Sequence, residues 1–199
     1  MSDSTALILL AAGGSLRLGR PKQLLEYQGQ TLLRRAAETA LASRCRPVVV
    51  VLGAESERCR EALRGLPVSI VVNSEWKEGM STSIRLGIST LENSPSRISA
   101  AILCVCDQPL LTPDILNALC EKYAATGLPM AAAEYAGDLG VPALFSADLF
   151  DKLKSLSGSD GARRLLRENP AAVASVPFPG GERDVDTPAD SARLSEEGQ

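Results

Sequence analysis

Residues 9–25 read LLAAGGSLRLGRPKQLL, and this stretch decides the fold. An apolar run over residues 6–12 predicts a buried strand, which stops at the glycine pair Gly13 and Gly14. Glycine lets backbone N–H groups approach a ligand closely, and consecutive N–H groups form a concavity for anions. The loop carries three cations in a chain of net charge −3, which favours a triphosphate as its ligand: Arg17, Arg20 and Lys22.

Two well-known phosphate-binding loops do not match this stretch. Gly14 and Gly19 have the spacing of a Walker A loop, but Arg20 and Pro21 follow where that loop needs Lys and Ser or Thr. The dinucleotide fingerprint GxGxxG is also absent. What remains is Leu-Ala-Ala-Gly-x-Ser-x-Arg-x-Gly followed by Pro-Lys. This pattern resembles the signature loop of nucleotidyltransferases with a glycosyltransferase-A-like fold, and it matches too many positions for a turn with incidental cations.

The composition is that of one globular domain. A chain of 199 residues can bury a sizeable core, and 45% apolar with 23% charged residues is an ordinary balance. The negative net charge argues against general nucleic-acid binding, and no apolar run is long enough to span a membrane. The start, MSDSTALILL, lacks the features of a signal peptide, so we expect a cytoplasmic protein.

Histidine is absent, and the five cysteines have no zinc-like spacing. The chain therefore has no histidine base, no Ser-His-Asp triad and no histidine-ligated metal. Cys104 and Cys106 lie two apart in an apolar run, so we expect both as buried thiols on one face of a strand. Chemistry must rest on carboxylates, Lys, Arg, backbone amides or a metal held by oxygen.

Strand-like apolar runs alternate with helix-like amphipathic segments. In the first half, strands are expected at residues 6–12, 48–53, 68–72 and 100–106, and helices at 31–43, 56–64, 81–92 and from Thr112. The later, less regular part predicts strands at 130–135, 142–146 and 173–177, and helices at 148–156, 161–168 and from Thr187. The alternation predicts a Rossmann-like α/β/α sandwich of three layers with a mostly parallel sheet.

We expect no boundary between separate domains. The nucleotide-binding half is expected at about residues 5–110 and the acceptor-binding half at about 111–194, with a frayed tail at 195–199. In an open parallel sheet, ligands bind at the carboxyl ends of the strands. The residues that follow the predicted strands are therefore the candidates for chemistry.

Two carboxylate-bearing segments are candidates for a metal site. Asp107 directly follows the buried strand at 100–106, and the run Asp184-Val185-Asp186 precedes a predicted helix. Mg²⁺ prefers oxygen ligands and usually takes one or two carboxylates. We expect Asp107 and Asp186 to hold Mg²⁺ or Mn²⁺, with Asp184 in reserve because it shares a face with Asp186 in an extended segment. The alternatives are a strand-end turn for Asp107 and a helix-dipole partner for Asp186.

Two polar segments are candidates for ligand contacts. Residues 73–83, NSEWKEGMSTS, place the only tryptophan and several small polar residues at a helix N-terminus, which offers free N–H groups. The alternative is a helix capped by Ser81 with Trp76 packed nearby. Residues 158–163, GSDGAR, favour an anionic acceptor near Arg163 as much as a plain loop capped by Asp160.

The order of these blocks resembles the molybdenum cofactor cytidylyltransferases and their relatives among the MobA-like nucleotidyltransferases. The resemblance spans residues 10–188 and rests on LAAGGSLRLGRPKQLL, NSEWKEGMSTSI, CDQPLL, GVPALF, LSGSDGARRLL and DVDTP. It implies transfer of CMP from CTP to the phosphate of molybdenum-loaded molybdopterin, with release of pyrophosphate and delivery to a molybdoenzyme or its chaperone. The chain departs from many members at Val141, where they carry histidine near the acceptor, so the acceptor stays open.

The motifs and the resemblance together assign roles to named residues. The expected catalytic residues are Arg17, Lys22 and Asp107. The expected nucleotide contacts are Leu10, Ala11, Ala12, Gly13, Gly14, Ser15, Arg17, Lys22, Gly79, Met80, Ser81 and Asp107. The expected acceptor contacts are Trp76, Ser83, Gln108, Gly140, Pro142, Asp160 and Arg163.

The acceptor phosphate is expected to attack the α-phosphorus in line, and because it is already an anion it needs no general base. Two alternatives use the same loop: guanylyl transfer to molybdopterin, and cytidylyl or uridylyl transfer to a sugar or alditol phosphate. A third alternative is a non-catalytic protein that binds and delivers the finished cofactor.

Overall fold

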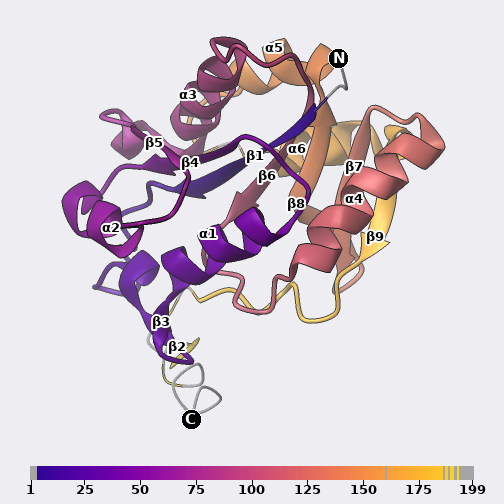
Figure 1. Cartoon of the computed structure of the whole chain (residues 1–199). Coiled ribbons are helices and arrows are strands. Elements are labelled where there is room, and N and C mark those ends of the chain that lie inside the picture. Colours follow the sequence, from indigo (N-terminus) through magenta and orange to yellow (C-terminus); the bar gives the residue numbers. More distant parts are fainter. Residues whose placement is uncertain (1–3, 160, 186, 188, 191, 193–199) are drawn as a thin grey trace.

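The computed structural model describes residues 4–159, 161–185, 187, 189–190 and 192, and within them a seven-stranded sheet forms the centre (Figure 1). The strand order is β5-β4-β1-β6-β8-β7-β9. The strands are β1 (Ser4–Ala11), β4 (Val48–Leu52), β5 (Ser69–Val72), β6 (Ile98–Val105), β7 (Met130–Tyr135), β8 (Asp138–Ser146) and β9 (Val173–Pro177).

The sheet is mixed but mostly parallel. β1 pairs in parallel with β4 and β6, β4 pairs in parallel with β5, and β7 pairs in parallel with β9. Among the described strands, β8 alone runs the opposite way, antiparallel to β6 and β7. Two residues, Ala136 and Gly137, join β7 to β8 with φ of 50° and 81°, which is the backbone of a tight hairpin turn. The carboxyl ends of the remaining strands therefore meet at one edge.

Helices cover both faces of the sheet, so the predicted three-layer arrangement is confirmed (Figure 1). One face packs against α1 (Leu32–Ala42), α2 (Ser56–Ala62) and α4 (Pro113–Thr126). The other packs against α3 (Met80–Glu92), α5 (Phe150–Lys154) and α6 (Arg163–Glu168). Along β1, side chains alternate between the two cores, with Leu7 and Leu9 on the first face and Ile8 and Leu10 on the second.

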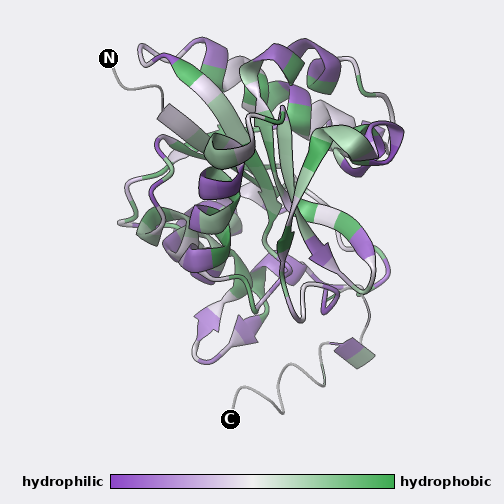
Figure 2. Cartoon of the chain, turned by 90° about the vertical axis from the view of Figure 1, so that its right-hand side faces the viewer, coloured by the Kyte–Doolittle hydropathy of each residue, from purple (hydrophilic) through white to green (hydrophobic). Residues whose placement is uncertain are grey.

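The apolar strands lie inside this sandwich, and the outward faces of the helices are hydrophilic (Figure 2). All five cysteines are buried free thiols, and Cys104 and Cys106 pack into the same core, as predicted. No helix in the described part of the chain is both long enough and apolar enough to cross a membrane.

Several short elements depart from the sequence prediction. They are the hairpin β2 (Glu26–Tyr27) and β3 (Gln30–Thr31), and the 3₁₀ helices η1 (Lys22–Leu24), η2 (Trp76–Glu78), η3 (Ala147–Leu149) and η4 (Pro170–Ala172). The predicted cap of α1 is confirmed, because the Thr31 hydroxyl accepts from the Arg34 N–H at 3.3 Å. The N-cap of α3 is Gly79, and Ser81 lies inside the helix rather than capping it.

Candidate active site

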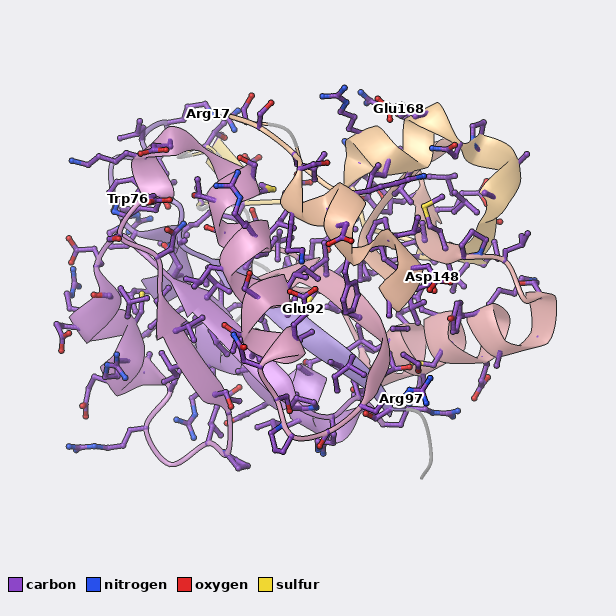
Figure 3. The ribbon with its side chains drawn as sticks, turned by 90° about the horizontal axis from the view of Figure 1, so that it is seen from above. Arg17, Trp76, Glu92, Arg97, Asp148 and Glu168 are labelled. Carbon is purple, nitrogen blue, oxygen red and sulfur yellow. The ribbon has the colours of Figure 1, made fainter. Side chains whose placement is uncertain are left out.

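A cavity of about 530 Å³ opens at the carboxyl edge of the parallel strands, a volume that suits a small-molecule site. Its wall combines the end of β1 with the loop after it, the end of β6, the start of α3 and the loop before α6. Figure 3 shows Arg17 and Trp76, which line this cavity, on the side of the molecule opposite Arg97, which precedes β6. The cavity thus lies where an open parallel sheet binds ligands.

The glycine loop is organised around Ser15, which has a positive φ of 51°. The Ser15 carbonyl accepts from the N–H groups of Leu18 and Gly19, both at 3.1 Å. The Ser15 hydroxyl oxygen accepts from the Lys22 N–H at 3.0 Å. These bonds fold the loop back on itself and bring Lys22 to the cavity wall.

Gln23 also holds this loop in place, through backbone carbonyls, and the sequence motifs do not point to it. Its side chain is 1% exposed, and its amide nitrogen donates to the carbonyls of Ala11 (2.9 Å) and Gly13 (2.7 Å). Carbonyls that leave a strand at a glycine turn lose their sheet partners, and Gln23 replaces those partners. The sequence signal was a polar residue between Lys22 and the apolar pair Leu24 and Leu25.

Lys22 and Asp107 form an ion pair between the glycine loop and the end of β6. Asp107 is 6% exposed, and its Oδ1 has no hydrogen-bond partner among the described residues. A buried oxygen without a partner costs on the order of 1–3 kcal/mol, more when it is charged. Asp107 therefore lines the cavity and carries a buried carboxylate oxygen without a partner, and such oxygens are the ligands that a hard divalent cation prefers.

The segment around Val185 brings a second carboxylate to this place. The Val185 N–H donates to the Asp107 carbonyl at 3.3 Å, and Asp184 lines the cavity. The predicted metal ligand Asp186 lies outside the described residues. Within the described residues, no group of three carboxylates, cysteines or histidines is placed to hold a metal ion.

Val185 anchors that segment through a small apolar cluster. Its side chain is 3% exposed and packs with residues of the glycine loop, η1's end, the hairpin and α1: Leu18, Leu25, Tyr27 and Leu32. The cluster joins the phosphate-loop candidate to the carboxylate segment. The relative position of Asp107 and Asp184 therefore depends in part on the apolar packing of the Val185 side chain.

Val185→Ala is expected to lower the affinity for Mn²⁺ about tenfold, because losing a group that orients metal ligands has costs of this order. The substitution also removes buried methyl groups and costs on the order of 2 kcal/mol of stability. Electron paramagnetic resonance titration of free Mn²⁺ measures the affinity. Val176→Ala is the matched control, since Val176 is as buried but lies in β9 at the far edge of the sheet. Equal Mn²⁺ affinity in the two variants would contradict the role of Val185.

A polar network forms another part of the cavity wall. The Gln108 amide nitrogen donates to the carbonyls of Val141 (3.0 Å) and Gly181 (2.9 Å), which fixes the orientation of the amide. Its Oε1 is buried and has no partner among the described residues. The Tyr135 hydroxyl donates to the same Val141 carbonyl at 3.0 Å and accepts from Arg163 Nη2 at 3.0 Å. Val141 thus serves this wall through its backbone.

Two glycines permit close approaches around the cavity. Gly79 has a φ of 119°, and a Cβ there would lie 2.1 Å from the Gly158 carbonyl. That carbonyl accepts from the Ser81 N–H (3.3 Å) and hydroxyl (2.9 Å), so the loop before α6 rests on the start of α3. A Cβ on Gly14 would lie 2.8 Å from the Trp76 ring, which packs on the glycine loop.

The cavity collects most of the residues singled out from the sequence. Those that line it are Leu10, Ala11, Ala12, Gly13, Arg17, Lys22, Trp76, Gly79, Met80, Ser83, Asp107, Gln108 and Arg163. Those described but absent from the lining are Gly14, Ser15, Ser81, Gly140 and Pro142. Asp160, like Asp186, lies outside the described residues. Lining residues that the motif analysis missed are Gln23, Val105, Cys106, Tyr135, Ser159, Gly161 and Ala162.

Cys106 is the thiol nearest the chemistry, and it is not a nucleophile. Burial raises the pKa of the Cys106 thiol far above its usual range, so the group is neutral at physiological pH. Its side chain packs in the core behind Asp107. The charged groups left on the wall are cations, which can bind phosphates, and carboxylates, which can hold a metal ion.

A glycine loop, a lysine–aspartate pair and a second carboxylate at the carboxyl edge of a mostly parallel sheet define a site of the nucleotidyltransferase type. The chain belongs to the family of the MobA-like NTP transferase domain, whose model matches residues 7–173. The fold and the family agree with the predicted class.

Relatives with known names and structures support this placement. Nicotine blue oxidoreductase of Paenarthrobacter nicotinovorans is 36% identical over 173 residues, 83% of each chain. Purine catabolism protein PucB of Bacillus subtilis strain 168 is 31% identical over 193 residues, 91% of each chain. The crystal structure of Rv0371c from Mycobacterium tuberculosis H37Rv superposes with a TM-score of 0.84 at 28% identity, covering 98% of this chain and 100% of that one. Rv0371c has also been crystallised with manganese, and that structure gives a TM-score of 0.81 at 27% identity.

Proposed function

We propose that this nucleotidyltransferase moves CMP from CTP to the phosphate of molybdenum-loaded molybdopterin and releases pyrophosphate. The observation that carries the proposal is the Asp107 carboxylate, which pairs with Lys22 of the glycine loop and whose buried Oδ1 has no partner among the described residues. A buried carboxylate oxygen without a partner, next to a cation, suits a metal–triphosphate complex. The product would pass to a molybdoenzyme or its chaperone in the cytoplasm.

Each part of the cavity has a task in this reaction. Arg17 and Lys22 would hold the β- and γ-phosphates and stabilise the charge on the departing pyrophosphate. The base would lie against residues 10–12 and the start of α3. The acceptor phosphate would attack the α-phosphorus in line, and as an anion it needs no general base, in keeping with the lack of histidine.

Asp107 would hold Mg²⁺ or Mn²⁺, together with Asp184 or Asp186. The ion supplies charge neutralisation on the phosphate oxygens when it is bound. The fit rests on the donor set: carboxylate oxygens on the wall, one of them without a partner among the described residues. The relative crystallised with manganese supports a divalent ion in this fold.

The wall of Gln108, Tyr135 and Arg163 would receive the acceptor. Gln108 Oε1 needs a hydrogen-bond donor, and a pterin ring offers several N–H groups. Arg163 offers a cation for an anionic group of the acceptor. The same wall leaves two close alternatives, a guanylyl transfer to molybdopterin and a cytidylyl or uridylyl transfer to a sugar or alditol phosphate.

The test measures pyrophosphate release from CTP, GTP, UTP and ATP in the presence of Mg²⁺. Each nucleotide is combined with molybdenum-loaded molybdopterin, with sugar phosphates and with alditol phosphates. We expect CTP with molybdopterin to give a kcat/KM at least about tenfold above every other pair, a difference of about 1.4 kcal/mol. Pyrophosphate release only with GTP, or only with a sugar phosphate, would contradict the proposed substrates but would still support nucleotidyl transfer. Tight cofactor binding without pyrophosphate release would favour a delivery protein instead.

The relative named as an oxidoreductase calls for one further arm of the assay. Reduction of an electron-accepting dye by a reduced nicotinamide cofactor, without pyrophosphate release from any nucleotide, would contradict the proposed transfer.

A further inference from the structure

A second hollow of about 410 Å³ lies beside the active-site cavity. Its wall consists of three arginines, one glutamate and two small residues: Arg163, Arg164, Arg167, Glu168, Ser159 and Gly161. Three of these, Ser159, Gly161 and Arg163, also line the first cavity, so the two spaces share part of their walls. Figure 3 places Glu168 on the same side of the molecule as Arg17.

Among the described residues that line this hollow, three are arginines and one is a glutamate, so their charges do not cancel. Arg164 pairs with Glu168 across one helical turn at 2.8 Å. Arg167 has no hydrogen bond or ion pair to any described residue, and Arg163 commits Nη2 to the Tyr135 hydroxyl while its guanidinium lies 5.9 Å from the centre of that ring. Two guanidinium groups with N–H donors to spare therefore border the same space.

The spacing of those two arginines is unfavourable without a ligand. Arg163 and Arg167 are separated by four residues in α6, so they project from one face of the helix, and like charges at this spacing destabilise a helix. The helix has no acidic residue in its first turn to offset them. An oxyanion between the two would turn this repulsion into a pair of charge-assisted hydrogen bonds.

We propose that this arginine hollow binds a second oxyanion group of the acceptor substrate, separate from the attacking phosphate. The inference rests on the proposed function, because it assumes that the acceptor lies along the wall of Gln108, Tyr135 and Arg163. Arg163 borders both spaces, so it would contact the part of the acceptor that passes from the cavity into the hollow. A molybdenum-loaded pterin fits this description, since it carries an oxo-metal group in addition to its phosphate.

The test is calorimetric titration of inorganic molybdate and of inorganic phosphate into the full-length protein, with CTP present so that the triphosphate site is filled. At low ionic strength, we expect Arg167→Ala to weaken molybdate binding about tenfold. Arg167→Lys should bind with intermediate affinity, because it keeps the charge and loses the planar fork. Arg167→Glu should bind more weakly than Arg167→Ala. The matched control is Arg97→Ala, an exposed arginine on the opposite side of the molecule (Figure 3).

Two outcomes would overturn the inference. One is equal molybdate affinity in the wild type and Arg167→Ala, and the other is an equal loss in Arg97→Ala. If the wild type prefers phosphate to molybdate and Arg167→Ala loses this preference, the hollow is an oxyanion site, but its ligand is a phosphate group and not an oxo-metal group. A wild type that releases no pyrophosphate with any acceptor would contradict the proposed function, while the molybdate titration would still decide whether the hollow is an oxyanion site.

Discussion

Replacing Asp107 by alanine should lower the rate of nucleotidyl transfer at least about a hundredfold, with the chain still folded. The carboxylate supplies the one buried side-chain oxygen that is both charged and without a partner among the described residues, and it pairs with Lys22 through its other oxygen. Both links are lost in the variant. Single-turnover pyrophosphate release at saturating CTP and Mg²⁺ measures the chemical step, and a Mn²⁺ titration measures the loss of the ion.

The controls for Asp107→Ala separate chemistry from folding. Asp107→Asn keeps the shape of the side chain and removes its charge, and we expect it to lose nearly as much rate. The Asp107 carbonyl accepts from the Val185 N–H through the main chain, so the C-terminal segment stays attached in both variants. Asp148→Ala changes an exposed aspartate away from the cavity and should leave the rate unchanged. A rate within about threefold of the wild type in Asp107→Ala would refute the assignment.

The layered fold could be predicted because its long elements have clear periodicity. β7 and β9 begin and end where the sequence indicated, since each is an apolar run bounded by turn residues. The direction of β8 could not be predicted from its own residues. It follows from a connection of only two residues, Ala136 and Gly137, which is too short for a crossover between parallel strands.

The short elements beside the site were not predicted, for a different reason. η1 has three residues and β2 has two, so neither spans a full period of any pattern. They exist because the glycine loop must return to α1, and the apolar residues of that return pack together with Val185. These elements depend on tertiary contacts between residues 18–32 and Val185, which no local sequence pattern reveals.

The same distinction separates the site residues. Motifs pointed to Lys22, Asp107 and Trp76, because such residues carry charge or an unusual side chain at a strand end. They did not point to Gln23 or Tyr135, which act through backbone carbonyls: Gln23 on Ala11 and Gly13, Tyr135 on Val141. A carbonyl partner depends on distant backbone positions, so it leaves no local pattern.

Lys22→Ala is the second large expected effect, a loss of at least about a hundredfold in turnover together with a raised KM for CTP. Lys22 lies at the cavity wall because the Ser15 hydroxyl holds its N–H and Gln23 anchors the next position. Its removal takes away a phosphate cation and leaves the Asp107 carboxylate buried without its partner, at a stability cost on the order of 1–3 kcal/mol. Steady-state kinetics and thermal unfolding, run on the same preparation, measure the two effects.

The double variant Lys22→Ala with Asp107→Ala decides whether the two residues act as one unit. If they hold a single metal–triphosphate complex, the double variant should be little slower than either single variant, because residues that act together are strongly non-additive. Its stability should recover part of the loss in Lys22→Ala, since no unpaired carboxylate remains. Lys22→Arg keeps the charge and should retain more activity than Lys22→Ala, with the flat guanidinium limiting the rescue. Rate losses that simply multiply would show two independent sites of action and would contradict the shared complex.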